Sequence, residues 1–237
     1  MSNAAQALSA LPGFDPCAVP ALPLPDLPPV PPERLTPSAL RERFRHPPAW
    51  APEVRQDSRF FNQQMPRRAA VLVPLVAHSG GLTVLLTERT SGLRSHAGQI
   101  AFPGGQADPQ DRNPIDTALR EAGEEIALPP STAEVLGLLP PYVTSSRYDV
   151  TPVVALIDPA FAPRQNLVEV AQIFEAPLSF LMDPAHHRWH RFVQGGGPDE
   201  PGRVHEWFSM PWHGLAATGG LPREWFIWGA TAGMLRN

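Results

Sequence analysis

Residues 102–128 read FPGGQADPQDRNPIDTALREAGEEIAL, which predicts a glycine-containing turn followed by one amphipathic helix. Asn113 followed by Pro114 is typical of a helix start, because asparagine caps the first turn and proline is tolerated at its first position. Pro129 and Pro130 then end the helix. Between these limits, apolar residues recur with helical spacing, which predicts one buried stripe: Ile115, Ala118, Leu119, Ala122 and Ile126.

Three glutamates lie off that stripe. Glu121, Glu124 and Glu125 have the spacing i, i+3, i+4, so their carboxylates share one face of the helix. A solvated acidic face is the simplest interpretation of such a cluster. The surroundings favour another one, because a Gly-Gly turn precedes the helix and Arg120 adjoins the first glutamate. Clustered carboxylates are the hard oxygen ligands that Mg²⁺ or Mn²⁺ requires, so the segment predicts a metal site.

The composition of the 237 residues describes a soluble globular protein with a real core, since 43% are hydrophobic and 18% are charged. No stretch approaches the roughly 18 unbroken apolar residues of a transmembrane helix, so we expect no membrane association. A net charge of −4 without a basic block excludes a nucleic-acid binding surface. The N-terminus lacks the features of a secretory signal, so we expect a cytoplasmic protein.

Two residue counts limit the chemistry further. Cys17 is the one cysteine, which excludes an intramolecular disulfide and a cysteine-based zinc cluster. The chain has no lysine, and all 19 basic residues are arginine. Biased codon usage is the simplest explanation. Any phosphate clamp must nevertheless consist of guanidinium groups, which bind phosphate oxygens bidentately.

The local composition divides the chain into two regions. Residues 1–52 are rich in proline and predict a mobile or surface-wrapping arm, with one short helix at 37–44 capped by Thr36. A linker is the simpler interpretation of this arm, and a proline-rich motif for a partner is the alternative. Because the arm shows no apolar periodicity, we expect the chain to fold without residues 1–35.

Residues 53–237 form the second region, which is expected to be the folded domain. Short β-rich runs at 69–77 and 82–87 flank a hairpin turn at 78–81, and further strands are expected at 135–139 and 150–157. A second helix is expected at 223–235. Few helices among many short strands predict an α/β sandwich with a mixed β-sheet.

The segment that begins at Gly105 resembles the Nudix box, Gly-x5-Glu-x7-Arg-Glu-U-x-Glu-Glu-x-Gly-U, where U is aliphatic. Its half from Arg120 to Glu125 matches fully. There are three departures: Asp111 replaces a glutamate, the spacing from it to Arg120 is one residue longer, and Ala127 replaces the last glycine. Alanine can be accommodated there if the backbone is not left-handed. The resemblance implies a Nudix-type α/β/α sandwich.

The upstream sequence resembles a narrower group, the bacterial and peroxisomal CoA pyrophosphatases. Their signature is Leu-Leu-Thr-x-Arg-Ser/Ala-x3-Arg-x3-Gly-x3-Phe-Pro-Gly-Gly, and the chain matches it from Leu85 to Gly105 except at Thr90. The likeness continues to the C-terminus. It implies hydrolysis of the diphosphate of CoA or acyl-CoA, giving adenosine 3′,5′-bisphosphate and 4′-phosphopantetheine. Many such enzymes pair as dimers, so a homodimer is compatible with the resemblance.

The resemblance also implies roles for the residues of the box. Glu121 and Glu125 are expected to be the principal ligands of Mg²⁺ or Mn²⁺, and Glu124 a third ligand or the acceptor of the proton from water. Arg120 is expected to orient the glutamates. The backbone of Gly104 and Gly105 is expected to approach the metal and the diphosphate closely.

Residues outside the box complete the expected site. Glu169 is the candidate for a further carboxylate from a distant loop, and a surface glutamate is the alternative. Arg89, Arg94 and His96 are candidates for binding phosphate, with ordinary surface ion pairs as the alternative. Aromatic residues near the C-terminus are expected to pack against the sheet, with stacking on adenine as the alternative: Trp225, Phe226 and Trp228. Three histidines are expected to face solvent: His186, His187 and His190.

Two rival functions remain at this point. One is a Nudix enzyme that acts on ADP-ribose, a dinucleoside polyphosphate or a nucleotide sugar. The CoA-type signature upstream of the box disfavours it. The other is a catalytically silent Nudix-fold regulatory module. Such a module is expected to lack some of the glutamates, but Glu121, Glu124 and Glu125 are all present.

Overall fold

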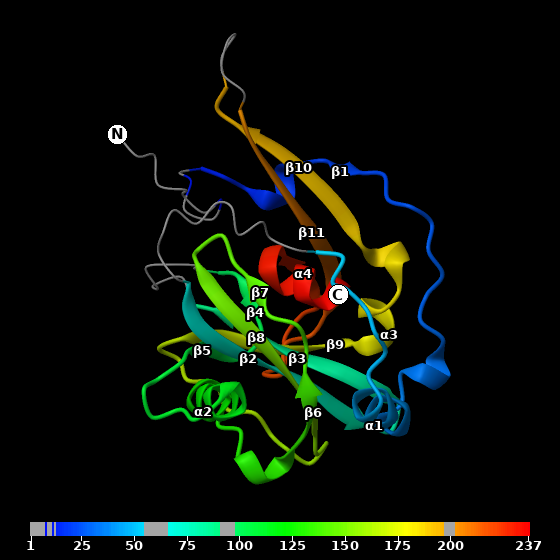
Figure 1. Cartoon of the computed structure of the whole chain (residues 1–237), viewed down its shortest axis with the longest axis vertical. Helices are drawn as coiled ribbons and strands as arrows, with labels where there is room; N and C mark the ends of the chain where they lie inside the picture. Colours follow the sequence, from blue (N-terminus) through cyan, green and yellow to red (C-terminus); the bar gives the residue numbers. More distant parts are fainter. Residues whose placement is uncertain (1–7, 9–10, 12, 55–65, 91–97, 197–201) are drawn as a thin grey trace.

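The structure is a computed structural model that describes residues 8, 11, 13–54, 66–90, 98–196 and 202–237 (Figure 1). Its centre is a mixed sheet in which the strand order is β4-β3-β2-β8-β6, with β5, β7 and β9 paired at the sides. The bounds are β2 Arg67–His78, β3 Gly81–Arg89, β4 Ile100–Ala101, β5 Gly104–Gln106, β6 Ala133–Leu138, β7 Tyr142–Val143, β8 Tyr148–Ile157 and β9 Val170–Pro177.

The middle of this sheet contains both strand orientations. β2 and β3 form the predicted antiparallel hairpin, with His78 paired to Gly81. β2 pairs in parallel with β8, so that Leu72 lies beside Val153, and both side chains are fully buried. A strand that is covered on both faces reads as a nearly continuous apolar run, which the sequence of β2 shows. The predicted mixed sheet is confirmed.

Helix α2 (Pro114–Ile126) covers one face of the mixed sheet. Its start is the predicted one, because the side chain of Asn113 accepts hydrogen bonds from the backbone N–H groups of Ile115 and Asp116. The predicted stripe is buried against the sheet, where Ala118 and Ile126 pack with apolar residues of β2 and β3. This packing fixes the direction in which the acidic face of the helix points.

The other face of the mixed sheet is covered by α4 (Gly229–Arg236) and by a second sheet of order β1-β10-β11-β12 (Figure 1). Its strands are β1 Ala21–Leu22, β10 Arg188–Gln194, β11 Arg203–Gly214 and β12 Arg223–Trp228. Between the two sheets lie α3 (Leu178–Leu181) and the 3₁₀ turn η6 (Pro184–His186), in the chain that leads from β9 to β10. Among the described residues, no helix has the length and apolar character needed to cross a bilayer.

The helix expected at 223–235 is wrong in its first half. Residues 223–228 form β12, in which Trp225 and Ile227 are buried while the residues between them are more exposed. This alternation is the period of a strand, and antiparallel pairing with β11 satisfies the backbone. Gly229 then has φ 65°, which turns the chain into α4.

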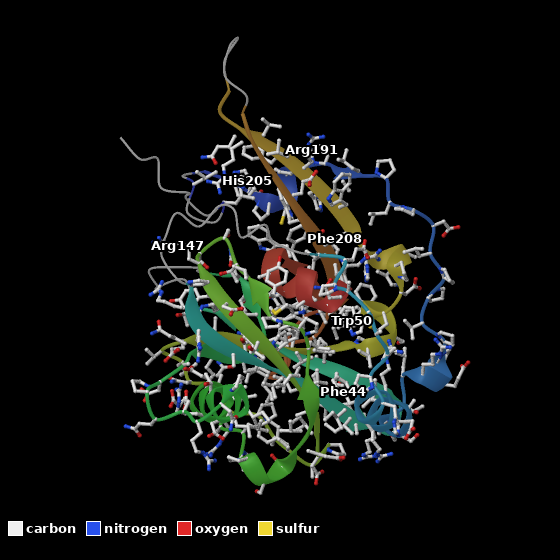
Figure 2. The ribbon with its side chains drawn as sticks, viewed as in Figure 1. Phe44, Trp50, Arg147, Arg191, His205 and Phe208 are labelled. Atoms are coloured by element: carbon white, nitrogen blue, oxygen red, sulfur yellow. The ribbon has the colours of Figure 1, made fainter. Side chains whose placement is uncertain are left out.

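The N-terminal segment wraps along the surface and contributes to both layers. Helix α1 (Pro37–Arg45) is capped by Thr36 as predicted, and Phe44 on this helix lies against Gly137 of β6 (Figure 2). Further upstream, β1 pairs with β10, and the ring of Phe14 lies 5.8 Å from that of Trp207. The arm therefore contacts the core through an aromatic ring although its sequence has no apolar periodicity, and folding of the chain without residues 1–35 stays a prediction.

Two of the three histidines expected to face solvent do not. His190 is 3% exposed, and its ring bonds to the carbonyl of Val19 at 2.9 Å and to the hydroxyl of Ser209 at 2.8 Å. His187 is 9% exposed and bonds to the carbonyl of Leu181. Burial lowers the pKa of both imidazoles, so they are neutral polar members of the core. His186 is exposed, as expected.

Candidate metal and diphosphate site

Arg120 holds the acidic face of α2 together. Its guanidinium donates to both carboxylate oxygens of Asp111, at 3.1 and 3.0 Å, and to Glu121 at 2.9 Å. A longer bond of 3.3 Å reaches Glu124. The bond from Arg120 holds the pKa of Asp111 well below its usual range, and the pair raises the pKa of Arg120. Arg120 therefore contacts two of the three glutamates, and its own anchor is Asp111.

Glu125 is a buried carboxylate. Its side chain is 3% exposed, and its oxygens lie 3.3 Å from the N–H of Gly104 and 3.6 Å from the guanidinium of Arg89. Burial raises the pKa of Glu125 to about 7, and Arg89 and the Gly104 N–H oppose this rise only in part. Arg89 and the N–H of Gly104 therefore compensate the negative charge of Glu125 only in part.

Glu121 lies one helical turn before Glu125 and is also mostly buried, with 15% of its side chain exposed. Burial raises its pKa, and the charges of Glu124 and Glu169 add to this effect, whereas Arg120 opposes it. The charge of Glu121 likewise raises the pKa of Glu125. This effect of Glu121 on Glu125 indicates that the two carboxylates lie within electrostatic range of each other.

The turn of Gly104 and Gly105 lies between the two carboxylates, Glu121 and Glu125, and strand β2. A Cβ atom on Gly105 would lie 2.6 Å from the carboxylate of Glu121, and one on Gly104 would lie 2.5 Å from the carbonyl oxygen of Ala70. Gly104 thus allows β5 to pair closely with β2, while its N–H bonds to Glu125. Gly105 leaves room for the Glu121 carboxylate. The structure gives these glycines a packing reason in addition to the expected approach to substrate.

Glu169 is brought to the site by a loop that is fixed at both ends. Asn166 donates its N–H to the carbonyl of Glu125 at 2.9 Å, and Thr90 donates its N–H to the carbonyl of Glu169 at 2.9 Å. The charge of Glu169 raises the pKa of both Glu121 and Glu125. This distant carboxylate therefore lies within electrostatic range of the α2 glutamates, although nothing in the spacing of the sequence indicates it.

Three side chains are expected to bind phosphate, and Arg89 is the one that lies in the described part of the chain. It lies at the end of β3, its side chain is 25% exposed, and it faces Glu125. Its Nε is buried and has no hydrogen-bond partner in the described part of the chain. Arg94 and His96 lie outside the described residues. Of these three candidates, Arg89 alone can be placed, and it lies beside Glu125.

The helix ends in a way that corrects one expectation. Ala127 has φ 57° and ψ 35°, which is the left-handed conformation, and its N–H bonds to the carbonyl of Gly123 at 3.1 Å. The position therefore still has the geometry for which the Nudix box carries glycine. An alanine is tolerated here at a steric cost, because left-handed backbone crowds its Cβ atom.

The residues present fit a divalent cation by their chemistry. Among the described residues, no three acidic, histidine or cysteine side chains converge as a preassembled ligand cluster. Glu121 and Glu125 nevertheless provide two mostly buried carboxylates whose anionic forms are disfavoured by burial and by neighbouring carboxylates, and the pKa of both is raised. A hard cation held by carboxylate oxygens would remove that penalty. Glu124, 56% exposed, and Glu169 lie at the border of this pair.

Comparison with known proteins gives the family. The NUDIX domain model matches residues 65–219. The chain is 42% identical to the uncharacterized Nudix hydrolase NudL of Yersinia enterocolitica over 169 residues, which are 71% of this chain and 78% of the relative. It is 43% identical to the protein of the same name from Escherichia coli strain SMS-3-5, over 72% of this chain and 80% of the relative.

Solved structures are more distant. The Nudix hydrolase RenU of M. smegmatis aligns with a TM-score of 0.42 and 23% identity, over 48% of this chain and 73% of that one. The residue pattern of α2 and the matches along the sequence lead to one conclusion: the chain belongs to the Nudix hydrolase family.

Proposed function

We propose that this Nudix hydrolase is a metal-dependent pyrophosphohydrolase that cleaves the diphosphate of coenzyme A or an acyl-CoA. The products are adenosine 3′,5′-bisphosphate and 4′-phosphopantetheine or its acyl form. The observation that carries the reaction type is the pair of mostly buried carboxylates, Glu121 and Glu125, on one face of α2. The match of residues 85–105 to the CoA pyrophosphatase signature supports the substrate.

In this proposal Glu121 and Glu125 hold Mg²⁺ or Mn²⁺, and Glu124 is a third ligand or the acceptor of the proton from water. A divalent ion bound there neutralises phosphate oxygens and lowers the pKa of coordinated water. Arg120 keeps the first carboxylate in place through its bidentate contact with Asp111. The N–H of Gly104 does the same for Glu125. Both carboxylates are thereby oriented before substrate binds.

The proton from the attacking water is accepted by Glu124 or Glu169. Glu124 is 56% exposed, and its two contacts with Arg120 are long, at 3.3 and 3.4 Å. Glu169 is half-buried and is carried by the anchored loop. Arg89 supplies a guanidinium beside Glu125 for the anionic diphosphate, which fits a chain whose basic residues are all arginine.

Chromatography of the products tests this proposal. Protein with Mg²⁺ or Mn²⁺ is incubated with CoA, acetyl-CoA, ADP-ribose and a dinucleoside polyphosphate. The expected result is adenosine 3′,5′-bisphosphate from both CoA compounds, with loss of activity after chelation of the metal. Turnover of ADP-ribose while CoA stays intact would contradict the substrate assignment and leave the family assignment unchanged.

A further inference from the structure

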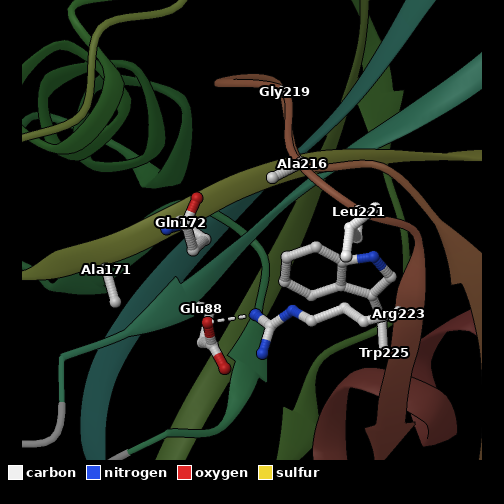
Figure 3. Close-up of a pocket in the computed structure, with 8 residues that line it drawn as sticks. All are labelled: Glu88, Ala171, Gln172, Ala216, Gly219, Leu221, Arg223 and Trp225. Atoms are coloured by element: carbon white, nitrogen blue, oxygen red, sulfur yellow. Dashed lines mark hydrogen bonds and ion pairs between the residues drawn. The ribbon is translucent and has the colours of Figure 1, made fainter.

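A surface pocket of about 320 Å³ lies between the two sheets, and no residue of α2 lines it (Figure 3). One wall comes from β3 and β9, through Glu88 and Gln172. The opposite wall comes from β12 and the loop before it, through Leu221, Arg223 and Trp225. The volume is at the lower end of the range for small-molecule sites.

A stack of flat groups forms one side of the pocket. The rings of Phe174 and Trp225 are 4.1 Å apart and 10° from parallel. The guanidinium carbon of Arg223 lies 3.7 Å from the centre of the Trp225 ring. Since Phe174 covers one face of the indole, the guanidinium must cover the other. Trp225 is therefore 1% exposed and has no free face for a ligand, whereas Arg223 does.

Arg223 is held in that orientation by Glu88. The two side chains form an ion pair across the pocket, from β12 to β3 (Figure 3). A guanidinium held by a carboxylate and an indole has a fixed position over the ring, and guanidinium planes stack well on flat aromatic groups. The free side of Arg223 is thus ready to continue the stack with one further flat ring.

Leu221 stands at the rim of the pocket and packs against little else. It is 90% exposed, the most exposed of the large hydrophobic side chains that the structure describes. Gly219 and Gly220 precede it with φ +83° and +113°, a turn that residues with a Cβ atom adopt only with strain. The turn therefore presents an apolar side chain to solvent beside the guanidinium of Arg223.

Gln172 adds hydrogen bonds that can select one kind of ring. Its carbonyl oxygen accepts from the hydroxyl of Thr218 at 3.0 Å. An amide oxygen has two lone pairs and the amide nitrogen has two hydrogens, so the group can still accept and donate one bond side by side. This donor–acceptor pair matches the edge of adenine, where N6 donates and N7 accepts.

The pocket lies behind the proposed catalytic site. Arg89 points to Glu125 of α2, whereas the preceding Glu88 points to Arg223 of β12, so these neighbours face opposite sides of the sheet. β9 pairs with β3 alone among the long strands, and its register shifts near Ala171, which also lines the pocket. β9 is therefore the edge around which a ligand that reaches both faces of the sheet would have to pass.

We propose that the Arg223–Gln172–Leu221 pocket binds the adenine ring of an adenine nucleotide. The ring stacks on the guanidinium of Arg223, packs against Leu221 and bonds to the amide of Gln172. This inference rests on the proposed function for its place in catalysis, where it would hold the nucleotide end of the substrate. The binding itself does not depend on which diphosphate is cleaved.

The test is a nuclear magnetic resonance titration of the full chain with adenosine 5′-monophosphate, and with ribose 5-phosphate as the probe without a base. A Trp225→Phe variant assigns the indole N–H signal of Trp225, which bonds to the carbonyl of Gly214 at 3.0 Å. We expect adenosine 5′-monophosphate to shift this signal and ribose 5-phosphate to leave it in place. Leu221→Ser and Gln172→Ala should each weaken nucleotide binding about fivefold or more.

Leu138→Ser is the matched control, because Leu138 is also an exposed leucine, at 46%, but lies on β6 outside the pocket. It should leave nucleotide affinity unchanged. Equal affinity of the two phosphates, or unchanged affinity in both pocket variants, would overturn the inference. Nucleotide binding in a protein that leaves CoA intact would contradict the proposed function alone. Hydrolysis of CoA with an unchanged KM in both pocket variants would contradict the pocket alone.

Discussion

The two faces of the mixed sheet bury opposite kinds of side chain. On the α2 face, the carboxylate of Glu125 is 3% exposed and its pKa is raised by burial to about 7. On the other face, the second sheet buries aromatic rings, among them Trp225 at 1% and Trp207 at 6% exposed. A buried carboxylate costs stability, whereas a buried ring supplies it. The α2 face therefore carries the proposed chemistry, whereas the buried rings of the other face stabilise the domain and support the proposed adenine pocket.

The largest expected effect is on the chemical face. Glu125→Gln keeps the size of the side chain, so the fold should tolerate it, and loss of one repelling carboxylate could leave the helix as stable as before. A neutral amide is a poor ligand for Mg²⁺. Turnover should fall by about a hundredfold or more, which corresponds to roughly 2.7 kcal/mol. Steady-state kinetics at saturating metal measure it.

Glu134→Gln is the control for this substitution. Glu134 lies outside the site and pairs with Arg41 at the surface, with half of its side chain exposed, so turnover should change little. If Glu125→Gln retains nearly full activity at low metal concentration and Glu124→Gln does not, the roles of these two glutamates are reversed.

On the aromatic face, Phe14→Ala should reduce stability and spare catalysis. Phe14 is half-buried against Phe192, Trp207 and Trp228. We expect a loss of about 2 kcal/mol, below the range for a fully buried phenylalanine. Denaturant unfolding gives this value, and kcat at 25 °C should stay within twofold. An unchanged free energy of unfolding would mean that the arm does not stabilise the domain.

Gly105→Ala tests whether the position of the Glu121 carboxylate matters as much as its presence. The new methyl group would lie 2.6 Å from that carboxylate, which must move. Turnover should fall about tenfold, equivalent to roughly 1.4 kcal/mol. Gly80→Ala is the matched control, because a Cβ atom there meets nothing within 4 Å. Equal activities of the two variants would contradict the steric role.

Ala127→Gly has the smallest expected effect. It lies on the α2 face of the sheet, but we expect it to raise stability and not to lower activity. The left-handed backbone at φ 57° suits glycine better than alanine. We expect a gain of about 0.5–1 kcal/mol and an unchanged turnover. Calorimetry should show a melting temperature higher by about 2 °C. A lower melting temperature would mean that the helix end is not strained in solution.

The same two faces differ in how much of them the sequence predicts. The start and buried stripe of α2, and the sheet hairpin at 78–81, follow from local spacing, and the structure confirms them. The second sheet depends on contacts between segments far apart in the chain. His190 bonds to Val19, 171 residues away, and no local pattern shows such a partner.

Within the site, the sequence again predicts local features and does not predict contacts between residues far apart in the chain. The glutamates of α2 are predictable because their spacing alone puts them on one helical face. The nearness of Glu169 depends on an anchored loop, and the left-handed backbone of Ala127 depends on how the helix ends. Asp111 is recognisable in the sequence as the first acid of the box, but no sequence pattern indicates its bidentate contact with Arg120.

Calorimetric titration of Mn²⁺ into the full chain tests the central claim most directly, because it requires no substrate. The claim is that the two mostly buried carboxylates of α2 hold the divalent cation. The wild-type protein should bind Mn²⁺ saturably, Glu125→Gln should bind it at least about tenfold more weakly, and Glu134→Gln should match the wild type. Equal Mn²⁺ affinity in the wild type and Glu125→Gln would contradict the claim.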